Sequence, residues 1–71
     1  MTNMEQLTKS DDKNVKLFAN TITNLAGSQG FYGRLWRDIN EMEQEQLDEL
    51  INEVKKQNFK ETLDVVLWLE C

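Results

Sequence analysis

Six carboxylates lie close together in the chain, between residues 41 and 53. They are Glu41, Glu43, Glu45, Asp48, Glu49 and Glu53. On one continuous helix, all except Glu43 would fall within an arc of about 140°, opposite the apolar residues of the same stretch. Such a helix would carry one charge per roughly 3.6 Å of axis, close to the spacing of about 3.4 Å along one DNA strand. The pattern suits a surface that imitates a nucleic-acid backbone. An ordinary solvated helix face, with acids favoured near the helix N-terminus, is the alternative interpretation.

A second distinctive stretch is SQGFYGRLWRDI, residues 28–39. Gly30 and Gly33 fall inside a short helical pattern, where each glycine costs up to about 1 kcal/mol relative to alanine. On a helical wheel the two glycines lie beside Arg34 and Arg37, opposite an apolar side. This face would expose bare backbone next to two guanidinium groups, which indicates a contact surface.

Three interpretations of this stretch are open. In the first, Ser28, the free N–H groups of the first helical turn and Arg34 hold a phosphate or carboxylate. Arg34 and Arg37 would then contact nucleic acid, with Tyr32 or Trp36 as a stacking platform. In the second, the glycine face meets a partner helix and the arginines bind its carboxylates. In the third, the glycines admit a helix of the same bundle and the arginines pair with the chain's own acids.

The composition excludes several classes of function. The chain has 71 residues, with 13 acids, 8 bases, no histidine and a net charge of −5. Without imidazole, no side chain has an ordinary pKa near neutrality for general acid–base catalysis. A zinc site needs about three or four Cys or His ligands, and Cys71 is the single candidate. We therefore expect a non-enzymatic protein without metal or cofactor.

The same composition bears on location. A single cysteine cannot form an intramolecular disulfide, which fits a reducing compartment. No apolar run approaches the roughly 20 residues that span a bilayer, and the polar N-terminus lacks the features of a signal peptide. We expect a cytoplasmic protein that does not contact a membrane.

The apolar periodicity predicts an all-α fold. Residues 1–11 are polar and predict a flexible tail, so that residues 12–71 form a single helical domain. From Val15 onward, apolar residues at i, i+3 and i+4 predict a helix. Asp11 or Asp12 is expected to cap this helix, and Gly27 to end it in the left-handed conformation.

Three further helices are predicted. Ser28 can cap a second one over residues 29–40. The capping-box spacing N-x-x-E occurs at Asn40 and again at Asn58. These boxes predict a third helix to about residue 57 and a fourth that reaches the C-terminus. The expected architecture is a small bundle of three to four short helices.

The last segment contains five consecutive apolar residues, from Val65 to Leu69. With no second strand-like segment to pair with, it is predicted as a helix that is apolar on most sides. Such a helix must be covered by the bundle or by a second copy of the chain. Trp68 and Leu69 are the candidate residues for self-association.

The stretch SQGFYGRLWRDI, followed after the acidic residues by NFKETLDVVLWLE, resembles a pattern in short uncharacterised proteins of bacteriophages and other mobile elements. The resemblance covers about residues 20–71 and implies a context rather than an activity. Phage genomes encode small acidic proteins that bind and block host machines, and some of these imitate DNA.

The favoured hypothesis is a phage-encoded inhibitor that occupies the basic nucleic-acid-binding surface of a host protein. The acidic face, Glu41, Glu45, Asp48, Glu49 and Glu53, would supply charge. Residues of the glycine-containing helix would supply orientation and further contacts to the partner, namely Arg34, Arg37, Tyr32 and Trp36. One alternative is a small homo-oligomeric assembly protein. The other is an accessory protein that binds nucleic acid through Arg34 and Arg37, which a net charge of −5 disfavours.

Overall fold

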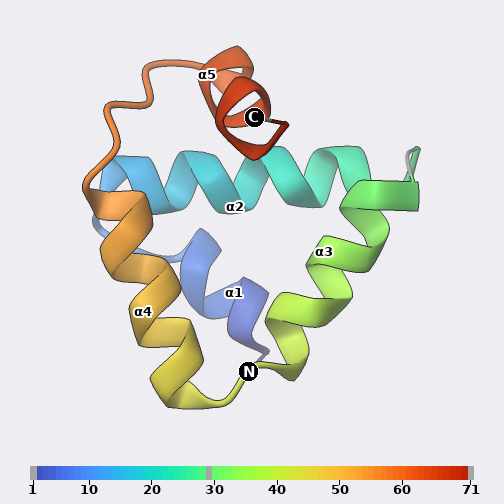
Figure 1. The fold of residues 1–71 in the computed structure, drawn as a ribbon, viewed down its shortest axis with the longest axis vertical. Helices are drawn as coiled ribbons and strands as arrows, with labels where there is room; N and C mark the ends of the chain where they lie inside the picture. Colours follow the sequence, from blue (N-terminus) through green and yellow to red (C-terminus); the bar gives the residue numbers. More distant parts are fainter. Residues whose placement is uncertain (1, 29, 71) are drawn as a thin grey trace.

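Helix α2 (Lys13–Ala26) is the longest element, and every other helix packs against it. In this computed structural model, which describes residues 2–28 and 30–70, α1, α3 and α4 lie on one side of α2 and α5 lies on the opposite side (Figure 1). The other helices are α1 (Asn3–Thr8), α3 (Gly30–Glu41), α4 (Gln44–Lys55) and α5 (Thr62–Leu69). The described ranges contain no strand. The predicted all-α class is confirmed, with one helix more than expected.

The start of α2 is set by its capping residue. The Asp12 carboxylate accepts hydrogen bonds from the backbone N–H groups of Asn14 at 2.9 Å and Val15 at 3.2 Å, which confirms Asp12 as the N-cap. The prediction for the other end is wrong, because Gly27 is right-handed, with φ of −79°. The N–H of Ser28 instead donates to the carbonyl of Leu25 at 3.1 Å, so a tighter turn closes the helix.

The predicted N-terminal tail is wrong over residues 3–8, which form α1. Met4 and Leu7 are each only 2% exposed, and α1 packs on α2 and α3. The side-chain oxygen of Asn40 accepts a hydrogen bond from the Met4 N–H at 2.9 Å, which satisfies a free donor in the first turn. Two apolar residues in one polar turn are too weak a pattern to predict a helix, and tertiary packing supplies what the local sequence lacks.

The predicted second helix, residues 29–40, agrees with α3 apart from its ends. Residue 29 lies outside the described residues, as does Cys71. The hydroxyl of Ser28, expected to cap this helix, donates instead to the Leu25 carbonyl at 3.4 Å. Ser28 therefore takes part in ending α2.

The two predicted capping boxes are displaced by three residues. Helix α4 has Glu43 as its N-cap, not Asn40, and α5 has Glu61, not Asn58. Asn40 lies inside α3, where its side chain is already bonded to α1. The N–H of Glu43 donates to the side-chain oxygen of Gln46 at 3.2 Å, the return bond of a capping box.

The core is one cluster to which every helix contributes. Its largest fully buried side chains include Tyr32, Phe18, Met4, Leu7, Ile22, Ile39 and Leu47. The indole of Trp68 contacts the rings of Phe18 and Phe59 edge-on, at centroid distances of 5.9 and 5.7 Å. These contacts attach α5 to α2.

Candidate functional site

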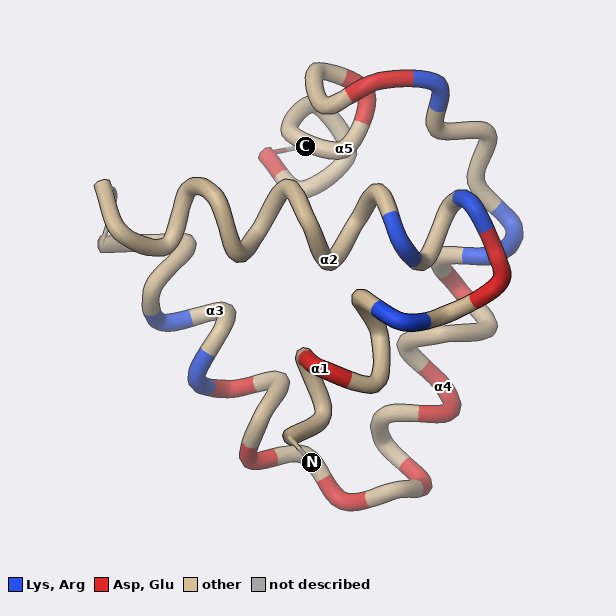
Figure 2. The backbone as a smooth tube through the Cα atoms, turned by 180° about the vertical axis from the view of Figure 1, so that it is seen from behind, with Lys and Arg blue, Asp and Glu red and all other residues tan. Residues whose placement is uncertain are grey.

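The five carboxylates predicted to share one helix face, together with Glu43, form an exposed surface that we call the acidic edge. Its members are Glu41, Glu43, Glu45, Asp48, Glu49 and Glu53, all exposed. They lie along α4 and the turn that joins α3 to α4 (Figure 2). The prediction of one continuous helix over residues 41–53 is wrong, because α3 ends at Glu41 and α4 begins at Gln44.

The break in the helix changes the charge spacing. Only the four carboxylates from Glu45 to Glu53 share α4. These four span about 12 Å, or one charge per roughly 4 Å, still near the spacing of about 3.4 Å along one DNA strand. Leu47 and Val54, 0% and 1% exposed, fix the opposite face of α4 in the core. The acids must therefore point to solvent.

The acidic edge is almost free of counter-charges. Within residues 2–28 and 30–70, the one ion pair joins the Lys56 ammonium to Glu53 at 3.4 Å, and both side chains are well exposed. The other five carboxylates have no cationic partner among the described residues. The edge therefore presents nearly its full negative charge to solvent.

One asparagine fixes the α3–α4 turn. The Asn3 amide donates hydrogen bonds to the carbonyls of Ile39 at 2.8 Å and Met42 at 2.9 Å. The Ile39 carbonyl lies in the last turn of α3 and also accepts from the Met42 N–H at 3.2 Å, and the Met42 carbonyl lies in the turn that follows α3. Asn3 thus holds Glu41 and Glu43 at a defined position relative to α1.

The fold also creates a positive surface that the sequence did not reveal, which we call the lysine corner. It comprises all six lysines, Lys9, Lys13, Lys16, Lys55, Lys56 and Lys60, each exposed. They gather around the N-terminal end of α2 (Figure 2). Three separate segments supply them, so no local motif could have indicated the cluster.

Asn14 holds the lysine corner together. Its amide donates to the Gln57 carbonyl and, at 3.4 Å, to that of Val54. Its side-chain oxygen accepts from the N–H of Phe59 at 3.2 Å. One side chain on α2 therefore binds both the end of α4 and the loop that leads to α5.

The two glycines of α3 have different environments. A Cβ atom on Gly33 would lie 3.2 Å from the carbonyl oxygen of Ala26, so Gly33 permits close approach of the end of α2. A Cβ atom on Gly30 would meet nothing within 4 Å. For Gly33 the internal interpretation is correct, whereas Gly30 remains on an open surface.

The outer face of α3 has mixed charge. Arg34 and Arg37 are exposed and have no ion-pair partner in the part of the chain that the structure describes. The predicted internal pairing is therefore absent there. Each arginine precedes an exposed acid by one turn, Asp38 and Glu41 respectively. The face as a whole is close to neutral.

Tyr32 was predicted to contact a partner, and its burial shows that this prediction is wrong. Its side chain is 2% exposed, in the core, and packs edge-on against Phe31 at 5.1 Å. Its hydroxyl has no hydrogen-bond partner among the described residues. Burial raises the pKa of Tyr32 above its ordinary value of 10.0, and the nearby Glu70 carboxylate adds to the shift.

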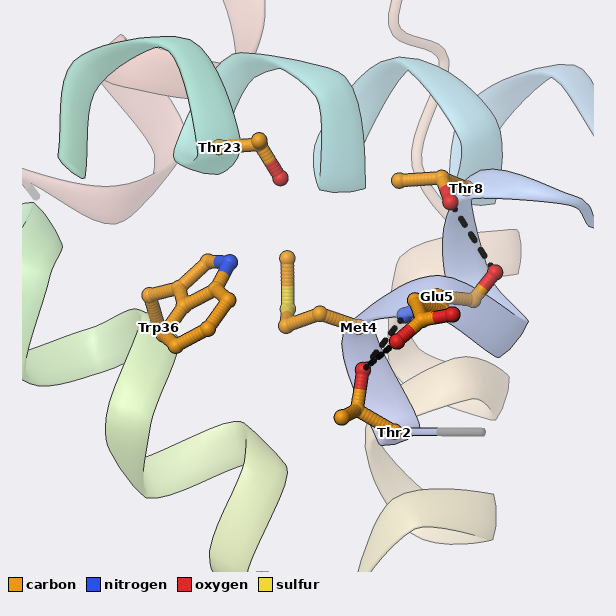
Figure 3. Close-up of a pocket in the computed structure, with 6 residues that line it drawn as sticks. All are labelled: Thr2, Met4, Glu5, Thr8, Thr23 and Trp36. Carbon is orange, nitrogen blue, oxygen red and sulfur yellow. Dashed lines mark hydrogen bonds between the residues drawn. The ribbon is translucent and has the colours of Figure 1, made fainter. Parts of the chain in front are cut away.

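Trp36 borders an open hollow of about 190 Å³ between α1, α2 and α3. Its indole faces Met4 of α1, beneath Thr23 of α2 (Figure 3). The Trp36 side chain is 37% exposed, so it both packs on the core and reaches solvent. Its partial exposure is compatible with the prediction that Trp36 contacts a partner.

The two residues expected to mediate self-association are not the most exposed residues of α5. Trp68 and Leu69 are half-buried and pack against the core cluster. Leu63 and Leu67 are instead 56% and 54% exposed. The sequence could not separate these residues, because α5 is apolar on nearly every side.

The described residues contain no group of three or more potential metal ligands. None of the helices in these ranges is long and apolar enough to cross a membrane. Comparisons with protein-family models, with curated proteins and with solved structures found no match.

Proposed function

We propose that the protein is a non-enzymatic binding protein whose acidic edge docks on the positively charged, nucleic-acid-binding surface of a partner protein. The observation that carries this proposal is the exposure of six carboxylates, five of them without a cationic partner among the described residues. The resemblance to short bacteriophage proteins suggests a phage-encoded inhibitor and a host target.

The negative charge of the acidic edge is expected to speed association with a positively charged partner surface. A surface of one sign raises the rate of association with an oppositely charged surface by about 10- to 1,000-fold. Screening weakens this attraction over about 8 Å at physiological ionic strength. Binding should therefore be fast, specific for a cationic surface and sensitive to salt.

The mixed charge of α3 argues against direct binding to nucleic acid. Arg34 and Arg37 lie one turn from Asp38 and Glu41, so a phosphate backbone would meet both signs of charge. A protein surface can place acids opposite the arginines and bases opposite the acidic edge. This arrangement favours a protein partner.

Trp36 supplies the second contact of the proposed interface. Its exposed part and the open hollow beside it could receive an apolar side chain of the partner. Tryptophan is enriched among the few residues that dominate binding energy. Trp36→Ala is expected to lower affinity by roughly tenfold or more without moving the acidic edge.

The proposal is tested by a tagged pull-down from nuclease-treated lysate of the bacterial host, eluted with rising salt. The protein is expected to retain a nucleic-acid-binding protein that elutes as salt increases. The double variant Asp48→Lys/Glu49→Lys should lower affinity by roughly 10- to 100-fold, because two attractive charges become repulsive.

The matched control is Asp11→Lys/Glu70→Lys, which changes the net charge equally at exposed residues outside the acidic edge and away from the hollow beside Trp36. Circular dichroism should show the same helical spectrum for both variants. Equal loss of binding in the two variants, or equal retention, would contradict a role specific to the acidic edge.

A further inference from the structure

The outer side of α5 has no covering element among the described residues. Leu63 and Leu67 are 56% and 54% exposed, while Val65 and Trp68 on the other side pack into the core. The N–H of Glu70 continues the helical pattern by donating to the Val66 carbonyl at 3.0 Å. Leu63, Leu67 and Glu70 follow the i, i+4, i+7 spacing of a single helix face.

A positive charge lies at the opposite end of this face. Lys60 immediately precedes the N-cap Glu61, and its N–H donates to the Asp64 carboxylate at 2.9 Å. Asp64 also accepts from the Glu61 N–H at 3.2 Å, so its charge is directed to the backbone. The face thus begins with two exposed residues of opposite charge, Lys60 and the N-cap Glu61, has two exposed leucines in its middle and ends with the exposed Glu70.

We infer that this face is a homodimer contact, in which α5 packs antiparallel against α5 of a second copy of the chain. A two-fold axis between Leu63 and Leu67 would place each Leu63 against the other copy's Leu67. Lys60 of each copy would then lie beside Glu70 of the other. Such a contact uses the same surface twice, as two-fold symmetry requires.

Charge selects the antiparallel orientation. A parallel pair would place Glu70 beside Glu70, so that end would repel, while the other end would bring together Lys60 and Glu61 of each copy with no net charge. The antiparallel pair places opposite charges together at each end. It also sets the positive N-terminus of one helix beside the negative C-terminus of the other.

The position of α5 makes this contact compatible with the net charge of −5. Helix α5 and the α3–α4 turn lie at opposite ends of the molecule (Figures 1 and 2). Two copies joined through α5 would hold the most acidic parts of their surfaces apart. Both acidic edges would remain free, so the dimer does not depend on the function proposed for them.

The contact area is small. Helix α5 has eight residues, a length of about 12 Å. Phe31, 54% exposed, borders the Glu70 end of the face and adds apolar area. The interface is still below the standard size of about 800 Å² per partner. A concentration-dependent dimer with a Kd of roughly 10 µM to 1 mM is expected.

Analytical ultracentrifugation of the purified full chain across that range of concentration tests the dimer. The wild-type protein should shift from monomer to dimer mass as concentration rises. Leu67→Lys should raise the Kd by at least about tenfold, because it removes a buried leucine contact and adds repulsion. A wild-type chain that stays monomeric throughout, or a dimer that Leu67→Lys leaves unchanged, would overturn the inference.

Charge exchange tests the orientation. Lys60→Glu and Glu70→Lys should each raise the Kd by roughly threefold, and the double variant should restore the wild-type value. The matched control Lys9→Glu makes the same charge change on the far side of α2 and should raise the Kd less than Lys60→Glu. Failure of the double variant to recover would overturn the antiparallel arrangement. Thermal melts show that each variant is folded.

Discussion

The α3–α4 turn and the α4–α5 loop are held in the same way but carry opposite charge. Asn3 donates to main-chain carbonyls at the end of α3, and Asn14 donates to those at the end of α4. Around the first lies much of the acidic edge, and around the second lies the lysine corner (Figure 2). One structural solution, an amide side chain that donates to the carbonyls at and just beyond a helix end, thus serves two surfaces of opposite sign.

The two regions differ in how they are assembled. Four acids of the edge share α4, so local helix geometry alone aligns them. The six lysines come from three segments, and only tertiary contacts bring them together. Acids also lie in the same segments as the lysines, namely Asp11, Asp12, Glu53 and Glu61. The corner is therefore partly neutralised, whereas Glu53 is the one member of the edge with an ion-pair partner among the described residues, which favours the edge as the binding surface.

Asn14→Ala should break the lysine corner and give the largest loss of stability. It removes the donor contact to the Gln57 carbonyl and the acceptor contact from the Phe59 N–H, while the Val54 carbonyl keeps its bond from the Gln57 N–H. The expected cost is about 2–3 kcal/mol, a large fraction of the stability of so small a domain. Thermal and urea unfolding measure it. Asn24→Ala, at an exposed site of the same helix, is the control and should change stability by less than about 0.5 kcal/mol.

Asn3→Ala should loosen the acidic edge with a smaller cost. Only the donor group of Asn3 is used, and the helix that carries it is short. We expect a loss of about 1–2 kcal/mol. Hydrogen exchange should show faster exchange at Met4 and around Met42, with little change near Phe59. Faster exchange at the lysine corner instead would contradict the view that the two asparagines act on separate regions.

A substitution in the core tests the contribution of one buried group to stability without altering the acidic edge or the lysine corner. Tyr32→Phe removes a buried hydroxyl that has no partner among the described residues. Stability at neutral pH should stay equal or rise by up to about 1 kcal/mol. Urea unfolding measures this, and a loss above 1 kcal/mol would indicate that the hydroxyl has a partner.

The same residue predicts a pH dependence. Its pKa is raised in the folded protein, so the unfolded chain loses the Tyr32 proton first as pH rises above 10.0. Stability should therefore fall with rising pH from that point, and Tyr32→Phe should reduce the fall. Tyr32 is the chain's one tyrosine, so its absorbance reports the titration directly. Equal slopes for the two proteins would contradict the shift.

Prediction from sequence succeeded where one local signal was sufficient. The periodicity of α2 and its cap at Asp12 are examples. It failed where one residue serves a distant segment: Asn40 fits a capping box by spacing, but its side chain is bonded to Met4. For the same reason the roles of Asn3 and Asn14 could not be seen, since their partners lie 36 to 45 residues away.

In the candidate site, too, features set by local sequence were predicted and features set by tertiary contacts were not. The outward direction of the acids followed from the helical wheel, although the break after Glu41 did not. Burial of Tyr32 and exposure of Leu63 and Leu67 depend on which side of each helix meets α2. In apolar helices, periodicity does not decide that side.

Competition with nucleic acid tests the central claim most directly. With the captured partner in hand, fluorescence anisotropy of a labelled oligonucleotide bound to it is followed while the protein is added. The account predicts that the wild-type chain displaces the oligonucleotide and that Asp48→Lys/Glu49→Lys does not. A stable ternary complex, with the oligonucleotide still bound at saturating protein, would contradict it.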